Sequence, residues 1–146
     1  MRFRTGKSVL LAIALVSGTG AALADKAARQ MSQSIVTADE ARAELFGVRL
    51  SGTMAANGSQ WSECIEPDGR TVYRIDGVEM VGKLDISNSG QACFSYAQSG
   101  FTRKSCFRIS RSNEGYTFWG GIEGVFHATS IQRDVRECSA GNAPLS

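Results

Sequence analysis

Residues 91–110, QACFSYAQSGFTRKSCFRIS, consist of two strand-like halves around a turn-prone centre at residues 98–102. A hairpin folded about that centre places Cys93 opposite Cys106, where a disulfide bond can form between neighbouring strands. The same register places Ser95 opposite Lys104. We therefore expect an antiparallel hairpin that is braced by a Cys93–Cys106 disulfide.

The hairpin register also separates apolar from polar side chains, and this separation specifies the pairing of strands in a sheet with one buried face. The inner face carries Phe94, Tyr96, Phe107 and Ile109. Residues 78–87 show the clearest alternation in the chain. Their inward-facing positions are Val78, Met80, Gly82, Leu84 and Ile86.

The rest of the chain after residue 47 continues this pattern of short strands and tight turns. Turn signals at Pro67-Asp68-Gly69, Asp76-Gly77 and Asn88-Ser89-Gly90 separate short strand-like runs at a spacing of about ten residues. About eight strands of this kind predict a small antiparallel up-and-down barrel or a curled meander, because closure removes exposed sheet edges. A two-sheet sandwich is the alternative architecture.

One short helix is expected before the strands. Thr37-Ala-Asp-Glu40 has the pattern of a capping box, in which Thr37 and Glu40 satisfy each other's free backbone N–H groups. The helix should run from Ala38 to Phe46 and end at Gly47.

The N-terminus has the three parts of an export signal. A basic start at Arg2, Arg4 and Lys7 precedes a short apolar run, and Ala22-Leu23-Ala24 matches the preferred cleavage pattern. We therefore expect residues 1–24 to be a cleaved signal peptide, residues 25–36 a flexible leader, and residues 37–146 a single domain. The predicted location is the periplasm or outside the cell, without stable membrane insertion after cleavage.

The four cysteines fit this destination, because oxidising compartments favour disulfides. If Cys93 pairs with Cys106, Cys64 and Cys138 form the second bridge by elimination. The C-x-x-C spacing of zinc, redox and haem sites does not occur, so the sequence predicts no cofactor and no metal site.

The charge balance gives no indication of a nucleic-acid partner. Removal of the signal leaves 13 of the 16 basic residues against 14 acidic ones, a net charge of about −1. A nearly neutral, mixed surface is not the basic footprint that nucleic-acid binding requires.

Several motifs of the mature chain resemble those of uncharacterised small exported β-domain proteins of Proteobacteria. They are Trp61-x-Glu-Cys64, Pro67-Asp-Gly-Arg70, Gly82-x-Leu-x-Ile86 and the two cysteine strands of the hairpin. The resemblance covers about residues 45–119. It implies a periplasmic β-domain and assigns no catalytic residue.

The residues that could carry chemistry are few. His127 is the one histidine, so a Ser-His-Asp or Cys-His mechanism would depend on it. Glu63 and Glu66 flank Cys64. Glu66 and Asp68 lie in or beside a turn, where carboxylates are usually solvated. We predict no catalytic residue, and an enzyme, which would be a hydrolase, is the least favoured of three function classes, after a binding module and a ligand carrier.

Two groups could instead form a binding surface. Six aromatic side chains could line a ligand cavity, although we expect them to fill the barrel interior: Trp61, Tyr73, Tyr96, Tyr116, Phe118 and Trp119. Tyr116, Phe118 and Trp119 precede a glycine-rich loop and could form a rim site. A basic stripe is expected on the outer face of the hairpin, at Arg103, Lys104, Arg108 and Arg111.

These features favour a non-catalytic binding or interaction module that acts on an unidentified protein or cell-envelope component. A lipocalin-like carrier of a small apolar ligand is one alternative. An inhibitor of an envelope-degrading enzyme is another, and it rests on fold type alone.

Overall fold

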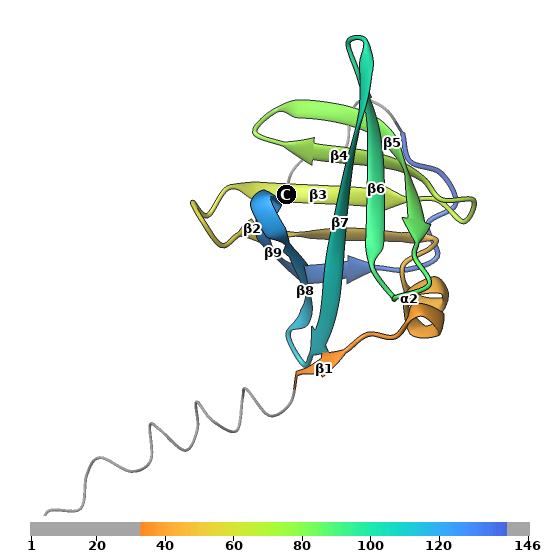
Figure 1. The fold of residues 1–146 in the computed structure, drawn as a ribbon, viewed down its shortest axis with the longest axis vertical. Coiled ribbons are helices and arrows are strands. Elements are labelled where there is room, and N and C mark those ends of the chain that lie inside the picture. Colours follow the sequence, from red (N-terminus) through yellow and green to blue (C-terminus); the bar gives the residue numbers. More distant parts are fainter. Residues whose placement is uncertain (1–32, 140–146) are drawn as a thin grey trace, which may run out of the picture. The chain divides into compact units, whose positions relative to one another are not determined.

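The computed structural model describes residues 33–139; the predicted signal peptide and most of the predicted leader lie outside this range. The chain forms an eight-stranded antiparallel barrel, β2 to β9, with one further strand and one α-helix (Figure 1). The elements are β1 (Ser34–Ile35), α2 (Ala38–Glu44), β2 (Val48–Met54), β3 (Gln60–Ile65), β4 (Arg70–Ile75), β5 (Val78–Ile86), β6 (Ala92–Gln98), β7 (Phe101–Ser112), β8 (Gly115–Gly120), the 3₁₀ turn η1 (Gly121–Glu123) and β9 (Gly124–Gln132).

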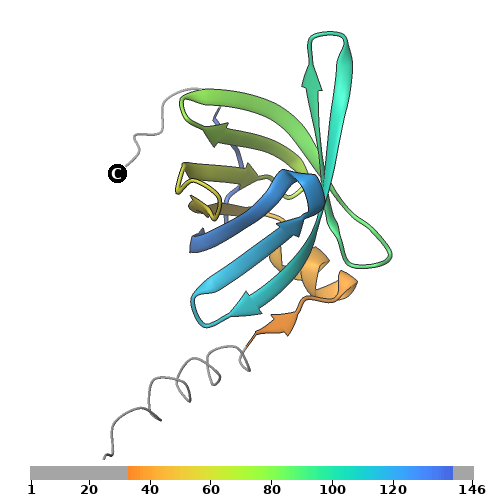
Figure 2. The same cartoon turned by 60° about the vertical axis from the view of Figure 1, so that its left-hand side comes forward.

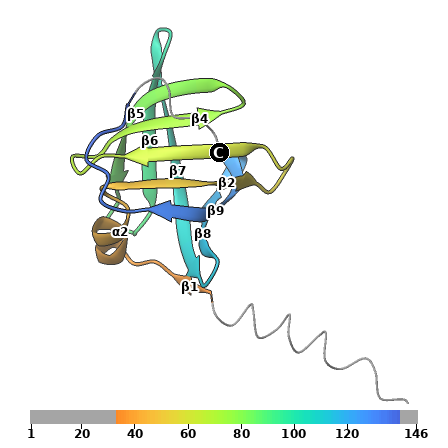
Figure 3. The ribbon, with the colours of Figure 1, turned by 180° about the vertical axis from the view of Figure 1, so that it is seen from behind.

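The barrel closes through β7, which is long enough to pair with two strands in succession. Its first part, Phe101 to Phe107, pairs with β6, and its second part, Arg108 to Ser112, pairs with β8. The remaining neighbours follow the order β6-β5-β4-β3-β2-β9-β8, as the view of β3, β2 and β9 from behind shows (Figure 3). The structure is therefore a closed barrel and not the alternative two-sheet sandwich.

The hairpin of β6 and β7 has the predicted register. Cys93 pairs with Cys106 and Ser95 with Lys104. Disulfides join Cys93 to Cys106 and Cys64 to Cys138, which confirms both predicted bridges. Figure 2 shows that the tip of this hairpin extends beyond the rest of the barrel.

Helix α2 begins with the predicted capping box at Thr37 and Glu40. It ends at Glu44, two residues earlier than expected, with Leu45 as its C-cap residue. Ala41 and Leu45 are fully buried in the main hydrophobic core. The helix therefore packs on one end of the barrel, beside the β5–β6 connection (Figure 1).

The ordered domain begins before the predicted boundary at residue 37. Ser34 and Ile35 form β1, which pairs with Arg111 and Ser110 of β7. Val36 is buried, and its N–H donates to the carbonyl oxygen of Ile109 at 3.0 Å. The end of the predicted flexible leader is therefore part of the sheet, because β7 continues past the end of β6 and leaves an edge that β1 can pair with.

Within residues 33–139, no helix is long and apolar enough to span a membrane.

The two disulfides should stabilise the fold to different degrees, because they close loops of different length. The Cys64–Cys138 bridge spans 74 residues and the Cys93–Cys106 bridge spans 13. Loop entropy predicts that the double variant Cys64→Ala/Cys138→Ala loses about 4 kcal/mol of unfolding free energy, against about 3 kcal/mol for Cys93→Ala/Cys106→Ala. Urea unfolding of both variants measures this difference, and a larger loss for the hairpin bridge would contradict it.

Candidate functional site

The end of the barrel opposite α2 contains a cavity of about 240 Å³. Its walls are mainly aromatic and aliphatic side chains that point inward from every barrel strand: Leu50, Met54, Trp61, Tyr73, Ile75, Met80, Phe94, Tyr96, Phe107, Phe118 and Phe126. The polar lining consists of Glu63, Arg103, Ser105 and Glu123. Of the six aromatic residues that were expected to fill the interior, four line this cavity instead: Trp61, Tyr73, Tyr96 and Phe118.

Glu63 is the carboxyl group inside this apolar enclosure. It lies on β3 between the buried residues Trp61 and Ile65, and strand alternation places all three on the inner face. Its Oε2 accepts a hydrogen bond of 2.6 Å from the Tyr96 hydroxyl. Its Oε1 and the indole Nε1 of Trp61 are buried without a hydrogen-bond partner among the described residues.

Gly82 allows Tyr96 to reach Glu63. Tyr96 of β6 lies directly opposite Gly82 of β5. A Cβ atom at Gly82 would lie 2.5 Å from the Tyr96 ring and 2.4 Å from the Ser95 carbonyl oxygen. The missing side chain thus leaves space for the ring to lie across β5 toward β3.

The enclosure changes the acidity of the groups that face it. Burial raises the pKa of Glu63 to about 8, and the hydrogen bond from Tyr96 and the nearby Thr71 hydroxyl offset this only in part. Burial and the adjacent Glu63 raise the pKa of Tyr73 to about 12. The same two causes raise the pKa of Tyr96. At neutral pH the carboxyl of Glu63 is therefore mainly protonated, and both tyrosines are uncharged.

An ion pair lies at the mouth of the cavity. Arg103 of β7 donates to both carboxylate oxygens of Glu123 in η1, at 2.9 and 2.7 Å. Apolar side chains are exposed at this end: Val78 at the start of β5, Phe101 at the start of β7, and Ile122, which is 99% exposed, in η1. This end of the barrel thus combines a neutralised charge pair with exposed apolar side chains.

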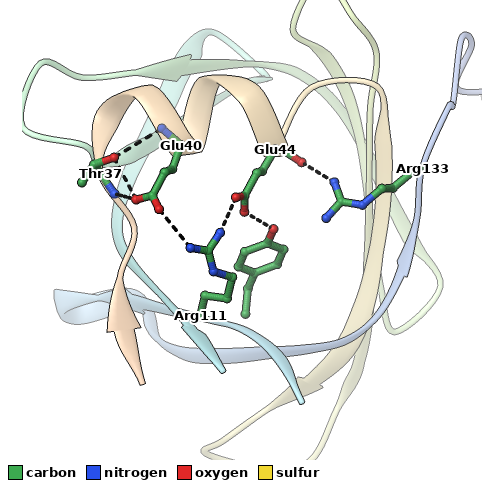
Figure 4. Close-up of polar contacts among 6 residues, drawn as sticks. Thr37, Glu40, Glu44, Arg111 and Arg133 are labelled. Atoms are coloured by element: carbon green, nitrogen blue, oxygen red, sulfur yellow. Dashed lines mark hydrogen bonds and ion pairs between the residues drawn. The ribbon is translucent and has the colours of Figure 1, made fainter. Parts of the chain in front are cut away.

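The opposite end is closed by a polar network under α2. Arg111 forms ion pairs with Glu40 and Glu44, and Arg133 donates to the backbone carbonyl of Glu44 (Figure 4). The Tyr116 hydroxyl donates to the Glu44 carboxylate. These bonds attach the helix to β7, β8 and the chain after β9.

The structure separates the residues that were predicted to form a rim site. Phe118 lines the cavity, whereas Tyr116 belongs to the network under α2. Trp119 faces outward, is partly exposed, and donates from Nε1 to the Ser110 hydroxyl at 3.1 Å. The three aromatics therefore do not form one surface, because alternation along β8 places Trp119 on the other face.

The predicted basic stripe is also divided. Lys104 and Arg108 are exposed on the outer face, as expected. Arg103 and Arg111 lie on the inner side of β7, one at the cavity mouth and one under α2. The prediction of four outward-facing cations is wrong, because odd-numbered residues of β7 share the face of Phe107.

The other candidate chemical groups have structural contacts. Nδ1 of His127 lies 3.2 Å from the Thr117 hydroxyl. Glu66 is buried and not solvated as expected: it pairs with Arg70 and accepts from the backbone N–H of Cys138 at 2.8 Å. Asp68 is exposed in its turn and pairs with Arg70. In residues 33–139, no cluster of three His, Cys, Asp or Glu side chains could hold a metal ion.

We found no match of this chain to a protein-family model, a curated protein or a solved structure. The functional interpretation therefore depends on the geometry of the cavity.

The raised pKa of Glu63 predicts a pH dependence of stability. The folded protein keeps a proton that the unfolded chain releases near pH 4.5, so stability falls as the pH rises from there to about 8. Glu63→Gln has no ionisable carboxyl group at this position, so it should not lose stability as the pH rises. Between pH 5 and pH 8.5, its unfolding free energy should rise relative to wild type by about 4 kcal/mol. Urea unfolding at both pH values measures the change, and a constant difference between the two proteins would refute it.

Proposed function

We propose that this protein is a non-catalytic binding protein that holds a small, mainly apolar ligand inside its barrel. The observation that carries the proposal is a cavity of about 240 Å³ that opens at one end of the barrel and has a mainly aromatic and aliphatic wall. Ligand sites are typically apolar hollows with a few placed polar groups, and Glu63 and Trp61 supply such groups here. A barrel of eight strands is wide enough for one small ligand.

The cavity volume limits the size of that ligand. A cavity of about 150 Å³ is known to hold benzene, so about 240 Å³ corresponds to roughly ten non-hydrogen atoms. The proposed ligand is therefore closer in size to a substituted aromatic ring than to a long-chain lipid.

The proposed location is the periplasm or the cell exterior. Two disulfides in a chain of this size are consistent with an oxidising compartment. The signal-like residues 1–24 and the resemblance to exported Proteobacterial domains support the same location.

A second candidate is partner binding at the open end, as in an interaction module or an enzyme inhibitor. The exposed apolar residues Val78, Phe101 and Ile122 favour it, because apolar rims mark contact surfaces. Ile122→Asp distinguishes the two functions. We expect it to leave ligand occupancy of the cavity unchanged, since Ile122 does not line the cavity.

Native mass spectrometry of freshly purified protein tests the main proposal. We expect an added mass of a small organic molecule on the wild type. Ser105 lines the cavity, so Ser105→Phe should fill it and remove the added mass. Lys104→Phe is the matched control, because its side chain points outward from the neighbouring position. Wild-type protein that is free of ligand and does not bind small aromatic probes would contradict the proposal.

A further inference from the structure

The charged groups of the cavity distinguish among classes of ligand. Three lining residues can carry charge: Glu63, Arg103 and Glu123. Arg103 is the one cation in the lining that the structure describes, and Glu123 neutralises it with both carboxylate oxygens. Glu63 forms no ion pair with a described basic residue; its hydrogen-bond partner is the neutral hydroxyl of Tyr96. The lining therefore has one acidic group in excess.

This excess disfavours an anionic ligand. A carboxylate or phosphate that entered the cavity would find its cation already paired and would lie in the same enclosure as Glu63. Burial of an unpaired charge is costly in a medium of low dielectric constant, and above about pH 8, where Glu63 is ionised, the anion would also lie near a like charge. Fatty acids and other anionic amphiphiles therefore do not match the site.

The rings around Glu63 match a cation. Trp61 and Tyr73 have ring centroids 6.5 Å apart, and Tyr73 and Tyr96 have centroids 5.8 Å apart. Together they form a continuous aromatic wall beside the carboxyl group. Ring faces attract cations within about 6 Å, and cages of this kind recognise substituted ammonium groups.

We propose that the cavity binds a small organic cation, with a substituted ammonium group held against Glu63 and the rings of Trp61, Tyr73 and Tyr96. The apolar body of the ligand would occupy the region of Phe94, Phe107 and Phe118. This inference rests on the proposed binding function and names the ligand class of the same site.

Binding of a cation should depend on pH, because it requires the ionised form of Glu63. Tyr73 and Tyr96, which face Glu63 from β4 and β6, stay uncharged, and Arg103 and Glu123 stay paired at the mouth. With a carboxyl pKa of about 8, affinity for a permanently charged ligand should rise about tenfold between pH 7 and pH 9.

Three probes of nearly equal size and shape test the charge preference: phenyltrimethylammonium, tert-butylbenzene and phenylacetate. Their dissociation constants can be measured at pH 9 by the change in amide chemical shifts. We expect the cation to bind at least about tenfold more tightly than the neutral probe, and the anion to bind most weakly. The pH titration with phenyltrimethylammonium uses wild-type protein alone, so it does not depend on the folding of any variant.

Two matched variants assign the preference to one carboxyl group. Glu63→Gln keeps the shape and the acceptor for Tyr96, and it should remove both the cation preference and the pH dependence. Asp85→Asn removes an exposed carboxylate on the outer face of β5 and should change neither.

The outcomes separate this inference from the proposed function. If the neutral probe binds as tightly as the cation, or if Glu63→Gln keeps the preference, the cation inference is wrong and the binding function stands. If none of the three probes binds inside the barrel, both are wrong.

Discussion

The whole structure depends on the closure of the sheet by β7. This strand pairs first with β6 and then with β8, so a meander that would otherwise have two free edges becomes a barrel. Closure directs the inward-facing side chains of all eight strands into one interior and fixes their positions. The two ends then differ. Helix α2 and its network with Arg111 close one end, whereas the other end keeps a cavity whose mouth carries the Arg103–Glu123 ion pair.

The central chemical feature is an acid that the closed barrel separates from water. A carboxyl group buried beside the hydroxyl groups of Tyr96 and Thr71 still favours its neutral form, and no described cation compensates for the lost solvation. Such a group lowers stability at high pH. A ligand that donates to it or pairs with it recovers part of this cost, which connects the buried acid to the proposed binding function. The enclosing aromatic wall and the buried indole N–H of Trp61 support the same role.

Much of the fold was predictable from local patterns. Alternation in residues 91–110 predicted the hairpin register and one disulfide, and the capping box predicted α2. The inward position of Arg103 was also predictable, because residues 103 and 107 are an even number of positions apart on one strand and therefore face the same side. Glu63 alternates with Trp61 and Ile65 in the same way, but its burial is produced by residues of β4, β5 and β6 that are distant in sequence. The cavity itself was not predictable, because its volume depends on how all eight strands close.

A titration of the Glu63 carboxyl carbon by nuclear magnetic resonance tests the central claim most directly. The closed barrel, with its acid held away from water, predicts a midpoint near pH 8. A midpoint near 4.5, the ordinary value for a solvated glutamate, would show that water reaches this carboxyl freely. It would contradict the burial of this acid inside the barrel and the pH-dependent cation binding proposed for it.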